Sequence, residues 1–140
     1  MKLIKLFEPL KIQDLEIKNR IVMPALGLGY TPKGEVSDVF MNFYERRAKG
    51  GAGLIIIGGL GINPTSGGTP YIGDDKFIPG YTAFAEKMHK HGAKVMAQIM
   101  HQGAYFPSPN AVSASAVRSN LTRMVPKELT IDEIKSFKSI

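Results

Sequence analysis

Apolar and polar residues alternate over residues 10–17, near the start of the chain. The pair Gln13–Asp14 divides this run into two short halves, which predicts a β-hairpin. The apolar positions of the predicted hairpin are Leu10, Ile12, Leu15 and Ile17. Ile21–Met23 then predicts a short buried strand. Residues 24–34 carry too many prolines and glycines for a helix, so they predict a loop.

The spacing of apolar residues then changes to the period of an α-helix. Ser37 or Asp38 can cap this helix, and Gly50–Gly51 ends it. The apolar positions of the helix are Phe40, Phe43, Tyr44 and Ala48. Residues Gly53–Gly59 are almost continuously apolar, which is typical of a strand buried on both faces of a parallel sheet. A long loop is predicted over residues 60–80, and such loops are usually functional or mobile.

A second helix, a third strand and a third helix start follow in the same order. Tyr81–His91 has helical apolar spacing and is followed by a glycine, and Ala93–Ile99 predicts a strand. Residues 102–129 are again irregular. Thr130 and Glu133 match a capping box, which predicts that a helix begins there.

The stretch Lys94–Gly103 joins an apolar strand to polar residues at its end. Met96, Gln98 and Met100 fall on one face of this strand, because strand side chains alternate. Burying a glutamine costs free energy unless its amide finds partners. The polar residues that begin at His101 fit two alternatives, a binding site at the end of a buried α/β strand or the solvated end of a core strand. The pattern alone leaves both open.

Strands alternate with helices along the chain, which indicates right-handed βαβ units and a parallel sheet. The segments after the strands are long, whereas those after the helices are short and rich in glycine. This asymmetry is typical of a (β/α)8 barrel, whose binding face lies at the C-terminal ends of the strands. A complete barrel needs roughly 250 residues. We therefore predict an α/β fold in which residues 1–140 are the N-terminal part of a TIM barrel with an N-terminal β-hairpin. The remainder of this partial domain would lie after Ile140.

Composition narrows the classes of function. The chain is 44% hydrophobic and 21% charged, a globular composition, and without cysteine it holds no disulfide or thiolate metal site. The net charge of +6 comes from basic residues spread along the chain, which argues against a nucleic-acid partner. The N-terminal residues lack the features of a signal peptide, and the longest apolar run, Gly51–Ile62, is too short to cross a bilayer. We therefore expect a cytoplasmic protein without a membrane partner.

Common catalytic and nucleotide-binding motifs are missing from the sequence. Gly58–Gly61 lacks the third glycine of a dinucleotide loop, and no helix opens directly after it. Asp74–Asp75 is expected to lie in a solvated turn. His89 and His91 are expected at the surface near a helix C-terminus, and His101 could face either a ligand or the solvent. The three histidines make no metal-ligand spacing, so no metal site is predicted.

Four segments of the chain together resemble a known family. They read LFEPLKI…LEIKNRIVMPA, GLIIIGG, AQIMHQG and VPKELTIDEI, in this order. In sequence and separation they resemble the old yellow enzyme family of NADH:flavin oxidoreductases. VSASAV followed by VPKELTIDEI is most similar to the branch that contains 2,4-dienoyl-CoA reductase and the bacterial bile-acid oxidoreductases. The resemblance covers essentially the whole chain.

The resemblance implies a TIM barrel that binds FMN over the C-terminal ends of its strands. It also implies that NAD(P)H is the hydride donor and that an activated C=C bond of a small molecule is reduced. In the family, the flavin is contacted from three barrel strands. The contacts come from the segment after the first strand, a small residue that ends the second strand and a glutamine on the third strand. The corresponding cofactor-binding residues are Pro24, Ala25, Leu26, Gly27, Gly59 and Gln98. Glycine allows close approach of a flat ring, and an amide both donates and accepts along its polar edge.

The chain departs from the family pattern and stops before the family's catalytic residues. Many relatives carry HxGR where residues 101–104 read HQGA, which puts a role for that arginine in doubt. In the family, the proton-donating, substrate-binding and FMN-phosphate-binding residues lie on later strands, so no catalytic residue is assigned here. An Fe–S cluster and a second flavin domain would be expected only after Ile140.

Two alternatives to a flavin-dependent reductase stay open. The chain could be a truncated or degenerate barrel fragment with no catalytic activity of its own. It could also be part of another TIM-barrel enzyme that binds a phosphate group without flavin. Open strand edges predict that the chain forms an oligomer or associates with the missing barrel half.

Overall fold

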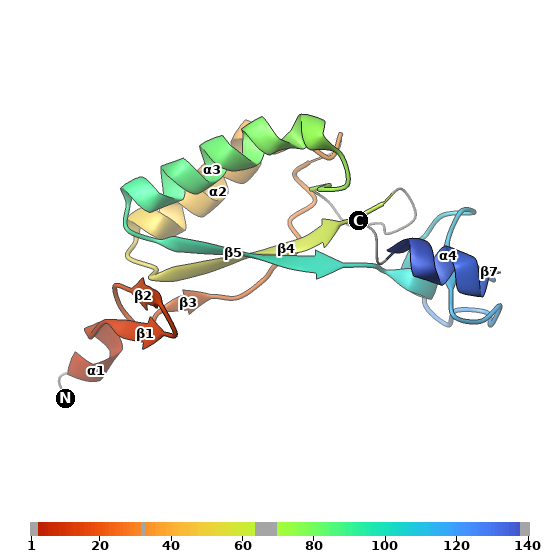
Figure 1. The fold of residues 1–140 in the computed structure, drawn as a ribbon, viewed down its shortest axis with the longest axis horizontal. Helices are drawn as coiled ribbons and strands as arrows, with labels where there is room; N and C mark the ends of the chain where they lie inside the picture. Colours follow the sequence, from red (N-terminus) through yellow and green to blue (C-terminus); the bar gives the residue numbers. More distant parts are fainter. Residues whose placement is uncertain (1–2, 32, 64–69, 138–140) are drawn as a thin grey trace.

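A three-stranded parallel sheet forms the centre of the computed structural model, which describes residues 3–31, 33–63 and 70–137. Its strands are β3 (Val22–Met23), β4 (Leu54–Gly61) and β5 (Lys94–Met100), in the order β3-β4-β5. Two helices, α2 (Asp38–Lys49) and α3 (Ile78–Lys90), connect successive strands and lie on the same side of the sheet (Figure 1). The predicted alternation of strands and helices and the parallel pairing are confirmed.

The chain begins with a short helix and a hairpin, which are α1 (Ile4–Phe7), β1 (Leu10–Ile12) and β2 (Leu15–Ile17). The antiparallel pairing of β1 with β2 confirms the predicted hairpin. The hairpin lies at the end of the sheet where the parallel strands begin (Figure 1). Just after it, the Nζ of Lys18 donates a hydrogen bond to the carbonyl of His91, 2.6 Å away. The sequence does not predict α1, because four residues are too few to show a helical period.

Helix α2 begins and ends as the sequence predicts. The Oγ of Ser37 accepts a hydrogen bond from the N–H of Phe40 at 3.2 Å, and Gly50 follows the last helical residue. Glu45 and Lys49, one turn apart, form an ion pair at 3.1 Å. The buried residues of α2 are Phe40, Tyr44 and Ala48, which recur at helical spacing.

Helix α3 begins earlier than the sequence predicts. It starts at Ile78, directly after the 3-10 helix η1 (Asp75–Phe77), whereas β4 continues to Gly61. The prediction of a loop over residues 60–80 is therefore wrong at both ends. Pro79 lies in the first turn of the helix, where its missing N–H leaves no hydrogen bond unmade. Residues 64–69 of the predicted loop lie outside the described part of the chain.

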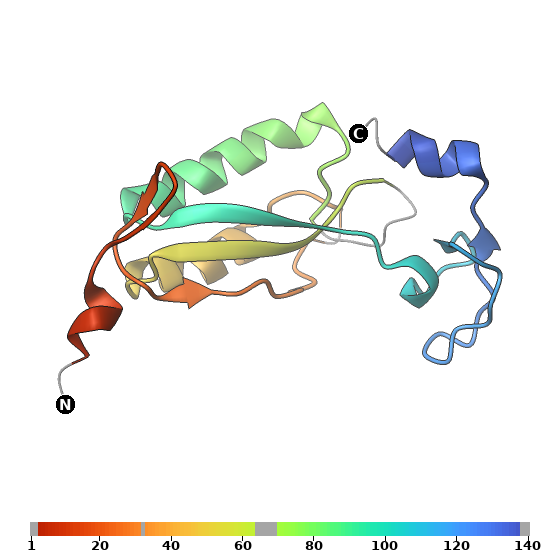
Figure 2. The ribbon, with the colours of Figure 1, turned by 60° about the horizontal axis from the view of Figure 1, so that its bottom comes forward.

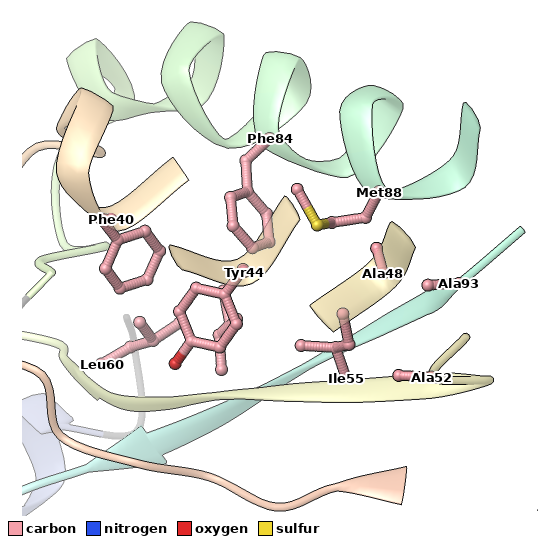
Figure 3. Close-up of a cluster of buried hydrophobic side chains, with 10 residues drawn as sticks. Phe40, Tyr44, Ala48, Ala52, Ile55, Leu60, Phe84, Met88 and Ala93 are labelled. Atoms are coloured by element: carbon pink, nitrogen blue, oxygen red, sulfur yellow. The ribbon is translucent and has the colours of Figure 1, made fainter. Parts of the chain in front are cut away.

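The hydrophobic core lies between the two helices and the sheet (Figure 3). Phe40, Tyr44 and Phe84 form its centre, with ring centroids between 4.8 and 5.6 Å apart. Ile55 of β4 and Met88 of α3 are fully buried in the same cluster. Burying one such side chain contributes about 1.5–3 kcal/mol, so this layer holds both helices to the sheet.

The last strand of the sheet is open rather than buried. Met96 is 48% exposed and Ile99 is 64% exposed, and Gln98 is exposed too. The predicted burial of this strand is therefore wrong for the described chain. The reason is topological: β5 is the outermost strand in the order β3-β4-β5, and the strands of residues 3–31, 33–63 and 70–137 do not close a barrel.

Residues 101–137 continue beyond the C-terminal end of β5 (Figures 1 and 2). They contain the 3-10 helix η2 (Gly103–Tyr105), the strands β6 (Val112–Ser113) and β7 (Lys127–Glu128), and α4 (Ile131–Ser136). The sequence predicts this region as irregular and misses the parallel pair of β6 and β7. The predicted capping box is confirmed, because the Thr130 hydroxyl accepts from the N–H of Glu133 and the Glu133 carboxylate accepts from the N–H of Thr130.

Candidate functional site

The C-terminal ends of the three parallel strands bring three residues together on one face. Ala25 follows β3, Gly58 lies in β4 and Gln98 lies in β5. A Cβ placed on Gly58 would lie 2.8 Å from the Cβ of Gln98 and 3.2 Å from the Cβ of Ala25. The neighbouring Ile57 packs into the core under the helices, so alternation puts Gly58 on the opposite face. We call these residues the Ala25–Gly58–Gln98 row.

A β-bulge in β4 creates this close approach. Ile57 pairs with Ala97 and Leu60 pairs with Ile99, so two residues of β4 lie opposite the single residue Gln98. The two residues are Gly58 and Gly59, and the peptide bond that joins them is cis. A Cβ on Gly59 would lie only 2.5 Å from the Sδ of Met100. Both positions need glycine because neighbouring atoms already fill the space of a side chain.

The family resemblance also assigns Pro24, Leu26, Gly27 and Gly59 to the cofactor site, and each is close in sequence to a residue of the row. Pro24, Leu26 and Gly27 are exposed in the segment that follows β3. A Cβ on Gly27 would meet no described atom within 4 Å, so space is open there. Gly59 lies against Met100 and does not join the row.

Sequence reasoning did not assign Gly58, the residue at the centre of the row, to the cofactor site. The double glycine is visible in the sequence, but the bulge decides which of the two meets Gln98. Only the pairing of β4 with β5 reveals it, because a period of two cannot be followed through a bulge.

The row can bind and orient a planar ligand. Gly58 is buried beneath Ala25 and Gln98, so a flat ring over the row would rest on the small Ala25 side chain and beside Gln98. The exposed Gln98 amide has two donor hydrogens and one acceptor oxygen, which suits a ring edge with alternating donors and acceptors. None of the three side chains ionises, so the row itself carries no acid or base.

His101 lies just past the end of β5. Its Nδ1 accepts a hydrogen bond from the N–H of Gly103 at 3.0 Å, which leaves the proton of the neutral ring on Nε2. Its ring meets the ring of Phe137 edge-on, with centroids 5.4 Å apart. Burial lowers the pKa of His101 because desolvation disfavours the imidazolium form. His101 is therefore a neutral, packed side chain at pH 7.

The remaining polar clusters have structural partners. Asp74 caps η1 and pairs with Lys76 at 2.7 Å in an exposed turn, as predicted. His89 is exposed as expected, whereas His91 is half-buried with its Nε2 3.2 Å from Glu45, because α2 packs beside α3. The described residues contain no group of three His, Asp or Glu side chains placed to hold a metal ion.

Among the helices of the described ranges, none combines the length and the apolar character that crossing a bilayer requires.

Parallel strands joined by helices that lie on one side of the sheet are the arrangement found in part of an α/β barrel. Residues 5–139 match the sequence model of the NADH:flavin oxidoreductase / NADH oxidase family. The chain belongs to this family, as its resemblance to the old yellow enzymes predicts.

Relatives share sequence with nearly the whole chain. The metal reductase of Desulforamulus reducens is 44% identical over 135 residues, which are 92% of this chain and 20% of that protein. The NADPH dehydrogenase of Clostridium acetobutylicum is 33% identical over 137 residues, 94% of this chain and 40% of that protein. The chain thus spans between a fifth and two fifths of the length of these relatives.

Solved structures of the family have the same fold over the matched part. A 2-naphthoyl-CoA reductase in complex with 2-naphthoyl-CoA matches with a TM-score of 0.88 and 26% identity, over 96% of this chain and 24% of that one. Morphinone reductase in complex with tetrahydroNAD matches with a TM-score of 0.83 and 27% identity, over 96% of this chain and 43% of that one. The chain corresponds to the N-terminal part of these barrels, which confirms the fold class for this part.

Proposed function

We propose that the chain is the N-terminal part of an FMN-dependent oxidoreductase that uses NAD(P)H to reduce an activated C=C bond. Membership of a family described by NADH and flavin chemistry supports the two cofactors. The names of two relatives, the NADPH dehydrogenase above and the NADH oxidase of Thermoanaerobacter brockii, support a nicotinamide donor. The choice of a C=C substrate rests on the resemblance to the old yellow enzymes.

The observation that carries the proposal is the Ala25–Gly58–Gln98 row. Because Gly58 has no side chain, Ala25 and Gln98 close over its backbone, each with an atom within 3.2 Å of the position that a Cβ would take. A ring across Ala25 therefore lies within reach of the Gln98 amide. The residues present fit a flavin: a small apolar side chain under the ring and an exposed amide for its polar edge. Pro24, Leu26 and Gly27 are proposed to lie along the ring, and Gly59 to permit the bulge that forms the row.

When bound, FMN supplies hydride transfer between the nicotinamide and the substrate carbon. The residues of this chain bind the ring and fix its orientation, which sets the direction from which the two substrates approach it. We expect the groups that hold the FMN phosphate and protonate the substrate on the strands that follow in the whole protein.

The 2,4-dienoyl-CoA reductase branch is our proposal for the closer relationship. The segment 112–133 carries the resemblance, and the length of the metal reductase, about five times that of the matched part, fits a longer multidomain protein. An Fe–S cluster and a second flavin domain would belong to such a longer protein.

Expression of the complete reading frame that contains this chain tests the proposed function. We expect a yellow protein with the absorbance bands of oxidised FMN, which bleach on anaerobic addition of NADH or NADPH. Release of the cofactor by denaturation and chromatography identifies it as FMN. A colourless product that takes up no added FMN would rule the proposal out.

The open edge of β5 favours a second proposal for the isolated chain, namely that it is inactive. Its row lacks the part of the cofactor site that later strands would supply, so we expect neither FMN binding nor NAD(P)H oxidation from residues 1–140 alone. Titration of the isolated chain with FMN, followed by flavin fluorescence, checks this. Saturable binding would show that the first three strands suffice.

A further inference from the structure

The segment that follows β3 continues beside β4 beyond the last strand pairing between them. β3 pairs with β4 only at Val22↔Leu54 and Met23↔Ile55. Ala25 and Gly58, two of the three residues of the row, both lie beyond this pairing. The separation of Ala25 from Gly58 determines the shape of the surface that the ring would meet, and the pairing of β3 with β4 does not fix that separation.

The hydroxyl of Tyr44 lies at this junction. The Tyr44 side chain is 0% exposed, and its hydroxyl points away from the helices toward the sheet (Figure 3). The hydroxyl donates a hydrogen bond to the carbonyl of Leu26 at 3.4 Å. The Tyr44 ring belongs to the same buried cluster as Ile57 and Leu60, which flank the two glycines of the bulge. One side chain of α2 thus hydrogen-bonds the segment after β3 and packs with the residues on either side of the bulge in β4.

The surroundings of Tyr44 hold this hydroxyl in place. Its ring packs against Phe40, Phe43 and Phe84, with centroid distances of 4.8, 5.2 and 5.6 Å. Burial raises the pKa of Tyr44, so the group stays protonated and remains a donor at neutral pH. A fixed ring with a protonated hydroxyl is a rigid link between two backbone segments.

We infer that Tyr44 is a positioning residue, whose hydroxyl fixes residues 24–27 against Gly58 from behind the sheet and so sets the geometry of the FMN-binding row. The inference rests on the proposed function for the identity of the ligand. A tyrosine that served only to fill the core would be replaceable by phenylalanine, because the ring alone fills that volume. Removing the hydroxyl alone therefore distinguishes a positioning role from a role in core packing.

Tyr81 offers a matched control for Tyr44. It also comes from a helix that covers the sheet, and its hydroxyl donates to a backbone carbonyl, that of Tyr71, at 3.3 Å. Burial raises the pKa of Tyr81 as well. Tyr44→Phe and Tyr81→Phe therefore each remove one partly buried hydrogen bond of the same kind, but only the Tyr44 bond holds the segment that contains Ala25.

The test compares both variants with the unmodified protein in the product of the complete reading frame. We expect Tyr44→Phe to weaken FMN binding roughly three- to tenfold, as loss of one hydrogen bond predicts, and to shift the visible absorption band and the midpoint potential of the bound flavin. Tyr81→Phe should leave all three unchanged within error. Equal effects of the two substitutions, or none from Tyr44→Phe, would overturn the inference.

Hydrogen exchange separates this inference from the proposed function, because it needs no flavin. Without added FMN, Tyr44→Phe should speed amide exchange in residues 24–28 and 58–61, and Tyr81→Phe should not. If the protein binds no FMN but this pattern appears, the proposed function fails while the link between the two segments stands. Unchanged exchange in both segments would overturn the positioning role itself.

Discussion

The two faces of the β3-β4-β5 sheet differ in burial and in what covers them. The face under α2 and α3 is closed by aromatic rings, and its residues Phe40, Tyr44 and Phe84 are almost completely buried. The other face is open along β5, where Met96 and Gln98 are exposed, and it carries the Ala25–Gly58–Gln98 row. One face holds the fold together, and the other is the face on which we propose that the flavin and the rest of the barrel lie.

One residue, Tyr44, connects the two faces. The ring of Tyr44 belongs to the covered face, and its hydroxyl holds the carbonyl of Leu26, next to Ala25 of the row. Substitutions at most positions can therefore test one face without the other, whereas a substitution of Tyr44 affects both.

The largest effect is expected from truncating the covered face. Phe84→Ala should lower the free energy of unfolding by about 3–5 kcal/mol, because it leaves a cavity among packed rings. Met96→Ala on the open face should cost less than about 1 kcal/mol in the isolated chain, since its side chain is half in water already. Urea unfolding followed by circular dichroism measures both values. Similar losses would mean that the two faces do not differ as described.

The free edge of β5 should cause self-association of the isolated chain. An unpaired strand edge with the exposed Ile99 can pair with another copy, so sedimentation velocity should show dimers or larger species. Ile99→Lys should reduce the association, whereas Val39→Lys, at an exposed position on α2, should not. A monodisperse monomer without any substitution would contradict this expectation.

A smaller effect is expected from the amide of the row. Gln98→Leu in the complete protein should weaken FMN binding by roughly tenfold or shift the flavin potential, since the ring edge would lose hydrogen bonds. Met96→Leu, two residues earlier on the same face, is the control that changes no polar group. Unchanged affinity together with an unchanged potential would show that Gln98 is only a strand residue.

The smallest effect concerns the outer surface of the helices, where Glu45 joins α2 to α3. Hydrogen bonds from Lys49, His91 and Lys87 lower the pKa of Glu45 from 4.5 to about 2. A lowered folded-state pKa stabilises the fold above pH 4.5, and this contribution disappears as the pH falls toward 2.

Unfolding curves of the unmodified chain and of Glu45→Gln should therefore differ above pH 4.5 and converge between about pH 4.5 and 2. A constant difference across that range would show that Glu45 does not titrate as its contacts imply.

The elements with long periodic patterns could be predicted from the sequence. The twelve residues of α2 show helical spacing with a serine cap, and the capping box at Thr130 is a local signal. β6 and β7 could not be predicted, because two residues show no period and their pairing joins segments about fifteen residues apart.

The candidate site was predictable only in part. Gln98 stands out as a polar residue within an apolar strand, and the family resemblance gives it a ligand. Gly58 and the hydroxyl of Tyr44 enter the site through the bulge and through packing of α2 on β4. Such contacts depend on tertiary structure, which a linear pattern does not record.

A crystal structure of the complete protein with FMN tests the central claim most directly, through the distance from the Gln98 amide to the flavin. We predict that the ring lies over the Ala25–Gly58–Gln98 row, with its polar edge about 2.9 Å from the Gln98 amide. A flavin bound away from the Ala25–Gly58–Gln98 row, with Gln98 in contact only with solvent or protein, would contradict the account.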